Sequence, residues 1–228
     1  MKGLILAAGF GTRLRPHTRI LPKPLFTLNG EPILGHAIRS LEQAGVDQIF
    51  INTHHLSDAI QAYVTETAFS ASITVIYEPE ILDTGGAIAN AAPRLGQEPF
   101  FVINADIITA IDLAAVYQTH INCGGLATLV LHDEPRFNKV TVDSQGAVSG
   151  FDGGPGALAF TGIQVVSPDI VSRFPDREKF SSIDLYRSLC PKKKINAHIE
   201  NSPFWSDIGT PEAYLDTSMQ MIAEKTLN

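Results

Sequence analysis

The chain has 228 residues and a formal net charge of −7 at neutral pH. That balance argues against a nucleic-acid-binding protein, which normally presents a basic face. Hydrophobic residues make up 44% of the chain and charged residues 18%, as in ordinary globular proteins. No apolar run approaches the ~18 residues that a membrane span needs. We therefore expect one globular domain over residues 1–228, with neither a nucleic acid nor a membrane as partner.

Predicted strands and helices alternate along the first half of the chain. The apolar pattern predicts strands at 4–7, 48–52, 73–77 and 100–104, and helices at 32–44, 56–63, 86–95 and 113–119. From residue 126 the period shifts toward two, which predicts strands near 127–131, 139–142, 147–151 and 158–166. Helices near 181–189 and 211–223 end the chain. This order predicts an α/β fold, a single-domain, doubly wound, mostly parallel, Rossmann-like sheet with helices on both faces and a small antiparallel extension.

The loop after the first predicted strand has the composition of a phosphate-binding site. Gly9 and Gly11 let backbone N–H groups approach an anion closely. Thr12 adds a hydroxyl, and Arg13 adds a planar cation suited to phosphate oxygens. Leu14 stands where a dinucleotide-binding G-x-G-x-x-G loop needs its third glycine. The sequence thus disfavours a nicotinamide-dependent oxidoreductase.

A long segment with three prolines follows, and it carries a second cation. Proline removes a backbone donor and disfavours helix before it, so residues 9–24 are expected to form a loop that wraps a ligand. Lys23 lies between Pro22 and Pro24. Its backbone therefore has little freedom to lose when a ligand binds.

These residues resemble the signature of the sugar-1-phosphate nucleotidylyltransferases. The matching motif is Leu6-Ala7-Ala8-Gly9-x-Gly11-Thr12-Arg13-Leu14-x-Pro16-x-Thr18, followed by Pro22-Lys23-Pro24. Two further segments match in chain order, Val102–Asp106 and Trp205–Glu212, so the resemblance covers essentially the whole chain. Members of this family join a sugar 1-phosphate to a nucleoside triphosphate and release pyrophosphate. The resemblance implies UTP or GTP and a sugar 1-phosphate as binding partners.

The resemblance also implies the catalytic and metal-binding residues. Asp106 ends a run of apolar residues, so its carboxylate should emerge from a buried strand at the floor of the site. Mg²⁺ usually takes one or two carboxylates plus substrate phosphates, and Asp207 would be the second carboxylate. Arg13 would bind the β,γ-phosphates and Lys23 would lie near the α-phosphate. Arg13, Lys23 and Asp106 are therefore the expected catalytic residues.

Further residues are expected to bind the two substrates. The nucleotide-binding set is Ala8, Gly9, Gly11, Thr12, Arg13, Lys23, Glu80 and Gly85. Glu80 would accept hydrogen bonds from base N–H groups, although an exposed loop carboxylate is the competing interpretation. The sugar-binding set is Asn104, Asn138, Thr161 and Gly162.

One segment departs from the family pattern. Many relatives carry Glu-Lys-Pro before the Thr-Gly step, and that lysine neutralises the sugar phosphate. Residues 149–156 of this chain contain no lysine, which resembles the compact N-acetylmuramate-1-phosphate uridylyltransferases. UTP with N-acetylmuramate 1-phosphate is the favoured pair. A guanylyltransferase acting on mannose or heptose 1-phosphate, and a nucleotide-binding homologue without turnover, stay open. Lys139 either replaces the lysine or faces solvent.

The cysteines and the first residues bear on cellular location. Cys123 and Cys190 lie far apart and form no C-x-x-C motif, so neither a zinc site nor a disulfide framework is expected. Met1 is followed almost at once by the first strand, which predicts no cleavable signal peptide. We expect a cytoplasmic protein, either a monomer or a homodimer.

Overall fold

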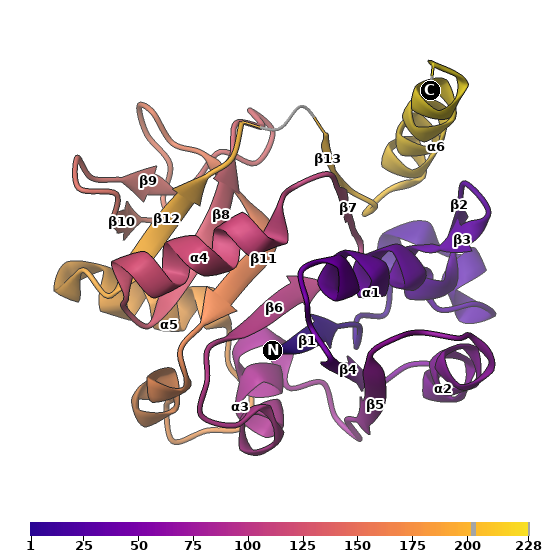
Figure 1. Ribbon diagram of the computed structural model, residues 1–228, viewed down its shortest axis with the longest axis horizontal. Coiled ribbons are helices and arrows are strands. Elements are labelled where there is room, and N and C mark those ends of the chain that lie inside the picture. The colour runs from indigo at the N-terminus through magenta and orange to yellow at the C-terminus, as the bar shows by residue number, and fades with distance from the viewer. Residues whose placement is uncertain (202–203, 228) are drawn as a thin grey trace.

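The computed structural model describes residues 1–201 and 204–227, and a seven-stranded sheet runs through its centre (Figure 1). The strands are β1 (Lys2–Leu6), β2 (Thr27–Leu28), β3 (Glu31–Pro32), β4 (Gln48–Thr53), β5 (Ser72–Tyr77), β6 (Phe100–Asn104), β7 (Ile107–Thr109), β8 (Ala127–His132), β9 (Thr141–Val142), β10 (Val148–Gly150), β11 (Ala159–Val166), β12 (Ile195–Ile199) and β13 (Trp205–Asp207). The helices are α1 (Ile33–Gln43), α2 (Ser57–Glu66), α3 (Asp83–Leu95), α4 (Leu113–Cys123), α5 (Ser182–Leu189) and α6 (Pro211–Leu227).

The strand order in the main sheet is β12-β8-β11-β6-β1-β4-β5. The four strands β5, β4, β1 and β6 are parallel to one another, as is the pair β8 and β12. The strand β11 runs antiparallel to both of its neighbours, β6 and β8. Three two-stranded antiparallel pairs lie outside this sheet. The expectation of a mostly parallel α/β sheet with a small antiparallel part is confirmed.

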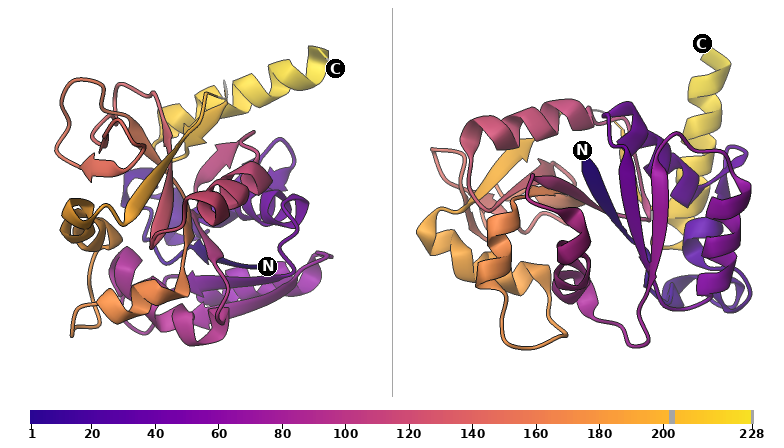
Figure 2. Two further views of the ribbon diagram at one scale, coloured as in Figure 1. Left: turned by 60° about the vertical axis from the view of Figure 1, so that its left-hand side comes forward. Right: turned by 60° about the horizontal axis from the view of Figure 1, so that its bottom comes forward.

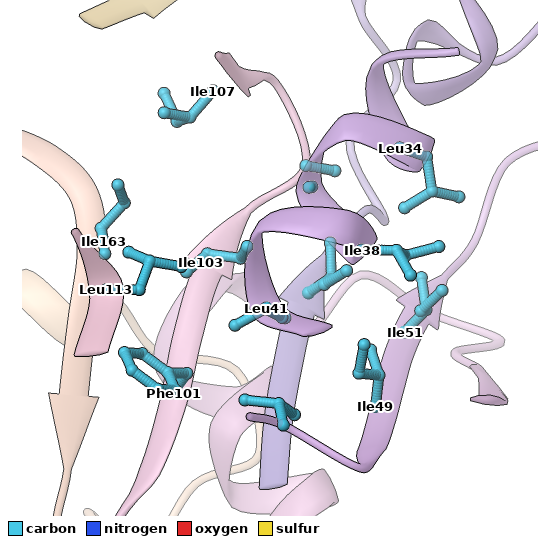
Figure 3. Packing of buried hydrophobic residues seen from close by; sticks show 14 of the residues in the cluster. Leu34, Ile38, Leu41, Ile49, Ile51, Phe101, Ile103, Ile107, Leu113 and Ile163 are labelled. Atoms are coloured by element: carbon cyan, nitrogen blue, oxygen red, sulfur yellow. The ribbon is translucent and has the colours of Figure 1, made fainter. Parts of the chain in front are cut away.

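Helices cover both faces of the sheet because successive strand residues point to opposite sides. On one face Phe101 and Ile103 of β6 pack with Leu34, Ile38 and Leu41 of α1, as Figure 3 shows. On the other face the alternate residues of β6 pack against α3 and α5. Figure 2 shows these helices on opposite sides of the sheet. The two apolar layers hold the carboxyl ends of the parallel strands in fixed positions.

Five of the described strands, β2, β3, β7, β12 and β13, were not expected from the sequence pattern. The strand β12 extends the sheet beyond β8, and only its two terminal isoleucines are strongly apolar. The strand β13 pairs with β7 just beyond the end of β6. The two strands predicted near 139–142 and 147–151 shorten to β9 and β10, which pair with each other.

Within the described part of the chain, no helix combines the length and apolar character needed to cross a membrane.

Candidate functional site

A cavity of about 270 Å³ opens at the carboxyl ends of β1, β4 and β6, beside the start of α3. Ligands of open α/β sheets bind at this edge, because loops from neighbouring strands converge there. Among the predicted site residues, Ala8, Gly9, Lys23, Asn104 and Asp106 line it. Its other lining residues are Leu6, Ala7, Pro24, Asn52, Glu78, Ile81, Asp83, Thr84, Ala87 and Ala105.

The glycine-rich loop folds back on itself in three short 3₁₀ turns, at residues 12–14, 17–19 and 23–25. Gly11 has a φ of 60°, and a Cβ there would lie 2.9 Å from Cγ2 of Thr18. The Thr18 hydroxyl donates to the Gly11 carbonyl at 3.0 Å. Position 11 therefore requires a glycine, because the first and second turns are in contact there. Thr12 is exposed in the first turn, outside the cavity lining.

Lys23 begins the third turn and reaches across the cavity mouth to Asp106. The two side chains form an ion pair, with 14% of the lysine and 18% of the aspartate side chain exposed. Asp106 follows β6 by two residues, as the sequence predicted for a carboxylate emerging from a buried strand. The pair joins the loop to the centre of the sheet.

Asp207 brings a second carboxylate to the same place. In β13 it pairs with Ile107, the residue next to Asp106. Its Oδ1 is buried and has no hydrogen-bond partner among the described residues. Burial, and then the negative charge of Asp106, raise the pKa of Asp207. Two close carboxylates with an unsatisfied buried oxygen fit a divalent cation.

Arg13 lies beside this carboxylate pair. A Cβ built at Gly209 would lie 2.5 Å from Nη2 of Arg13 and 2.6 Å from Oδ1 of Asp207. Gly209 thus leaves room for the guanidinium to approach the acidic end of β13. No cluster of three or more histidine, cysteine, aspartate or glutamate side chains occurs in the described ranges, so substrate phosphates would have to complete the shell of a hard cation.

Glu78, two residues before the predicted Glu80, is the glutamate that lines the cavity. Glu78 is 1% exposed and accepts a hydrogen bond from Nδ2 of Asn52 at 2.9 Å. Oδ1 of Asn52 accepts in turn from the Ala7 amide at 2.8 Å. Burial raises the pKa of Glu78. Glu80 is exposed and does not contribute to the lining.

Glu78 and Asn52 were not predicted as site residues, although each has a signal in the chain. Asn52 ends the predicted strand 48–52, and Glu78 directly follows the predicted strand 73–77. Polar residues at the carboxyl ends of parallel strands are candidates for a ligand site on that ground alone.

Gly85 packs helix α3 against the segment before α5. The amides of Gly85 and Gly86 both donate to the carbonyl of Phe180, at 2.9 and 3.1 Å. A Cβ on Gly85 would collide with the Phe180 ring. Gly85 is buried outside the cavity lining, whereas its neighbour Thr84 lines it. A nucleotide contact by Gly85 stays a prediction.

Asn104 and Gly162 meet on the other side of the cavity mouth. Gly162 has a φ of 80°, and a Cβ there would lie 2.6 Å from Nδ2 of Asn104. It occupies an irregularity in the pairing of β11 with β8. Bulges of this kind often lie beside ligand sites, where they redirect a strand. The structure therefore brings these two predicted sugar-binding residues together.

The other two predicted sugar-binding residues use their polar atoms within the protein. Thr161 is fully buried, and its hydroxyl donates to the Val130 carbonyl at 2.9 Å. Asn138 accepts from the Glu134 amide at 3.0 Å and donates to Oδ1 of Asp133 at 2.7 Å. Both residues thus have a structural role, and contacts with a sugar stay a prediction.

Comparison with known proteins agrees with this geometry. The family model described as nucleotidyl transferase matches residues 2–224. Mannose-1-phosphate guanylyltransferase 1 of Arabidopsis thaliana is 32% identical over 94% of this chain and 63% of its own length. N-acetylmuramate alpha-1-phosphate uridylyltransferase of Neisseria meningitidis serogroup B is 31% identical over 92% of this chain and 94% of its own length.

The chain therefore spans less than two thirds of the guanylyltransferase but nearly all of the uridylyltransferase. Among solved structures, HddC from Yersinia pseudotuberculosis superposes with a TM-score of 0.81, at 26% identity, over 96% of this chain and 99% of that one. The matched family model covers nearly every residue. Parts of the signature loop and Asp106 line one cavity, and Asp207 lies beside Asp106. The chain belongs to the nucleotidyl transferase family and is related to the sugar-1-phosphate nucleotidylyltransferases.

Proposed function

We propose that this protein transfers a nucleoside monophosphate from a nucleoside triphosphate to a sugar 1-phosphate and releases pyrophosphate. The observation that carries the proposal is the meeting of Lys23, Asp106 and Asp207 at the mouth of the cavity. These groups come from three segments distant in sequence. A cation and two carboxylates placed together match the needs of phosphoryl-transfer chemistry, which depends on positioning and charge stabilisation.

The reaction needs no base from the protein. A phosphate monoester has a second pKa of about 6, so the acceptor is largely ionised at neutral pH. One of its oxygens forms a bond to the α-phosphorus, and the bond from that phosphorus to the pyrophosphate oxygen breaks. The protein must align two anions that repel each other. Arg13 would bind the β,γ-phosphates. Lys23 would leave its ion pair with Asp106 and bind the α-phosphate instead.

Asp106 and Asp207 are the residues that would hold Mg²⁺. A bound divalent ion neutralises phosphate charge and orients the reacting groups. The buried, unpartnered Oδ1 of Asp207 supports this assignment, because an isolated buried polar atom otherwise costs stability.

For the substrates we propose UTP and N-acetylmuramate 1-phosphate. The support is the match along nearly the full length of both chains with the Neisseria uridylyltransferase. Ala7, Ala8 and the buried Glu78 line the same cavity, and we propose that the base binds beside them. A protonated Glu78 would donate to a uracil carbonyl and accept from the neighbouring N3–H.

A guanylyltransferase is the second candidate. HddC from Yersinia pseudotuberculosis was also solved as a complex with GMP-PN, and the Arabidopsis relative is named for guanylyl transfer. An ionised Glu78 would suit guanine, whose N1–H and N2–H groups form two adjacent donors. On this proposal the two bases would require opposite protonation states of Glu78.

We propose that this reaction takes place in the cytoplasm. Cys123 and Cys190 are both free thiols, which fits a reducing compartment.

A substrate screen tests the proposed function. Pyrophosphate release would be measured with Mg²⁺ for UTP, GTP, CTP, ATP and dTTP, each with N-acetylmuramate, mannose, glucose and heptose 1-phosphates. We expect the highest kcat/KM for UTP with N-acetylmuramate 1-phosphate. A preference for GTP with mannose or heptose 1-phosphate would select the second candidate. Folded protein that releases no pyrophosphate with any pair would contradict the transferase and favour a nucleotide-binding homologue without turnover.

A further inference from the structure

An acceptor with a doubly charged phosphate must come close to Asp106, Asp207 and a triphosphate, and it needs a cation of its own. Lys23 and Arg13 are assigned to the triphosphate. The segment 149–156, where many relatives have a lysine, contains neither lysine nor arginine. Another part of this chain must therefore supply the positive charge.

The loop between β8 and β9 brings an arginine toward the metal-binding carboxylates. Arg136 lies in this loop next to Phe137, whose ring contacts Trp205 of β13, the strand that carries Asp207. Lys139, the alternative that the sequence suggested, is exposed three residues further along the chain.

Aromatic contacts fix this loop to the strand that carries Asp207. The rings of Phe137 and Trp205 meet edge to face, with centroids 6.2 Å apart. The Trp205 indole N–H donates to the Thr161 carbonyl at 3.0 Å. Trp205 and Asp207 are two residues apart in β13, so their side chains lie on the same face of that strand. The loop is thereby anchored beside the carboxylates.

Arg136 itself is held in place while much of its guanidinium stays accessible. Its Nε donates to Oε1 of Glu134 at 2.9 Å, and its guanidinium carbon lies 5.5 Å from the centroid of the Phe137 ring. The side chain is 71% exposed. The Glu134 contact occupies Nε, and the terminal amino groups make no hydrogen bond to residues that the structure describes. A guanidinium with two such groups is suited to bidentate binding of a phosphate.

We propose that Arg136 binds the 1-phosphate of the acceptor sugar and holds it against the α-phosphate of the nucleotide. Glu134 and Phe137 are positioning residues that orient the guanidinium. This inference rests on the proposed function, and it assigns the acceptor phosphate to a residue outside the glycine-rich loop.

Kinetics of Arg136→Gln separate the acceptor from the nucleotide. We expect the KM for the sugar 1-phosphate to rise about tenfold or more, because a hydrogen bond to a charged group contributes about 1.5–3 kcal/mol. The KM for the nucleoside triphosphate should change less than about twofold. Arg136→Lys should recover part of the loss, since it keeps the charge but not the planar fork.

Arg187→Gln is the matched control. Arg187 is also a partly exposed arginine that lies over a phenylalanine, Phe151, and pairs with a carboxylate, Asp152. It belongs to α5, outside the cavity, and its variant should keep both KM values. The Arg136 proposal is overturned if Arg136→Gln leaves the sugar-phosphate KM unchanged, raises the nucleotide KM equally, or matches the Arg187 variant.

Two further measurements identify the bound anion and separate binding from turnover. Comparing N-acetylmuramate with N-acetylglucosamine 1-phosphate tests which anion is bound, because only the first sugar carries a carboxylate. Equal weakening with both supports the phosphate assignment, and an effect confined to N-acetylmuramate would overturn it. If the wild type shows no turnover, the proposed function fails. Calorimetric titration of these sugar phosphates would still test the role of Arg136. The Arg136 proposal requires that the wild type binds them and that Arg136→Gln binds them more weakly.

Discussion

Lys23 forms an ion pair with Asp106, 83 residues further along the chain, at the mouth of the cavity. Both side chains are largely buried, so each charge is compensated by its partner in the ion pair as long as no ligand is bound. The two residues are placed by different means. Prolines restrict the turn that carries the lysine, whereas the end of a central strand carries the aspartate. Lys23 is thus already positioned to bind a phosphate, and Asp106 to bind a divalent cation.

Replacement of Lys23 tests the role assigned to it in catalysis. We expect Lys23→Ala to lower kcat/KM by about 10²–10³, the typical cost of losing one preorganised charge in an active site. Lys192→Ala is the control, because Lys192 is exposed in a turn after α5. Steady-state kinetics measure both, and circular dichroism confirms folding. A folded Lys23 variant with activity within about threefold of wild type would contradict the assignment.

The closeness of Asp106 and Asp207 should destabilise the metal-free protein, although both carboxylates are needed to bind the metal. Asp207→Asn removes a buried charge that faces Asp106, so the metal-free protein should gain unfolding free energy at neutral pH. The same change should abolish the rise in melting temperature that Mg²⁺ and nucleotide produce together in the wild type. Differential scanning fluorimetry with and without Mg²⁺ reads out both effects. A variant that keeps the full Mg²⁺-dependent shift would exclude Asp207 as a ligand.

Glu78 should make stability depend on pH. Its pKa is raised by burial, so the folded state binds the proton more tightly than the unfolded state does. The wild type therefore has its full stability below the unfolded pKa and loses stability as the pH rises through the folded pKa. The Gln variant has no such titration. The unfolding free energy of Glu78→Gln relative to wild type should increase from pH 4 to pH 8.

Urea unfolding across that pH range measures this difference. Glu80→Gln is the matched control, since Glu80 is an exposed glutamate in the same loop and its variant should follow the wild type at every pH. A constant difference between Glu78→Gln and wild type would show that Glu78 does not titrate as its burial implies.

A methyl group at Gly162 should disturb the sugar side of the cavity. Gly162→Ala places a Cβ against Asn104 at a positive φ, so it incurs both backbone strain and a steric clash. Strain of this kind costs about 1–3 kcal/mol. Gly146→Ala is the control, because Gly146 has a φ of 83° and a Cβ there would meet no atom within 4 Å.

Both glycine variants should lose stability, and only Gly162→Ala should also raise the KM for the sugar 1-phosphate. Chemical unfolding and steady-state kinetics measure the two effects. Equal KM values for the two variants would show that the contact between Gly162 and Asn104 does not shape the acceptor site.

Much of the sheet could be predicted because its strands are short apolar runs separated by amphipathic helices. The strand at 100–104 has the predicted limits, and Asp112 caps α4 by accepting from the Ala115 amide. The strand β12 could not be predicted, since its alternate positions are polar and its pairing with β8 connects distant segments. Such pairing is a property of the tertiary fold and leaves little local signal.

The site divides in the same way. Local motifs indicated Lys23 and Asp106, and the structure places both in the cavity lining. Their catalytic roles stay a prediction. The sequence could not distinguish Glu80 from Glu78, because the two residues lie in one loop and only the folded chain shows that the Glu78 side chain lines the cavity. Arg136 gave no signal, because its place beside Asp207 depends on the contact between Phe137 and Trp205.

The most direct test of the proposed chemistry is Mg²⁺-dependent pyrophosphate release by the wild type and by Asp106→Asn, each with UTP and N-acetylmuramate 1-phosphate and with GTP and mannose 1-phosphate. We predict turnover by the wild type that requires Mg²⁺, and a loss of about 10²-fold or more in the folded variant. Near-normal turnover by Asp106→Asn would contradict the claim that the carboxylates at the end of β6 and in β13 form the centre of the reaction.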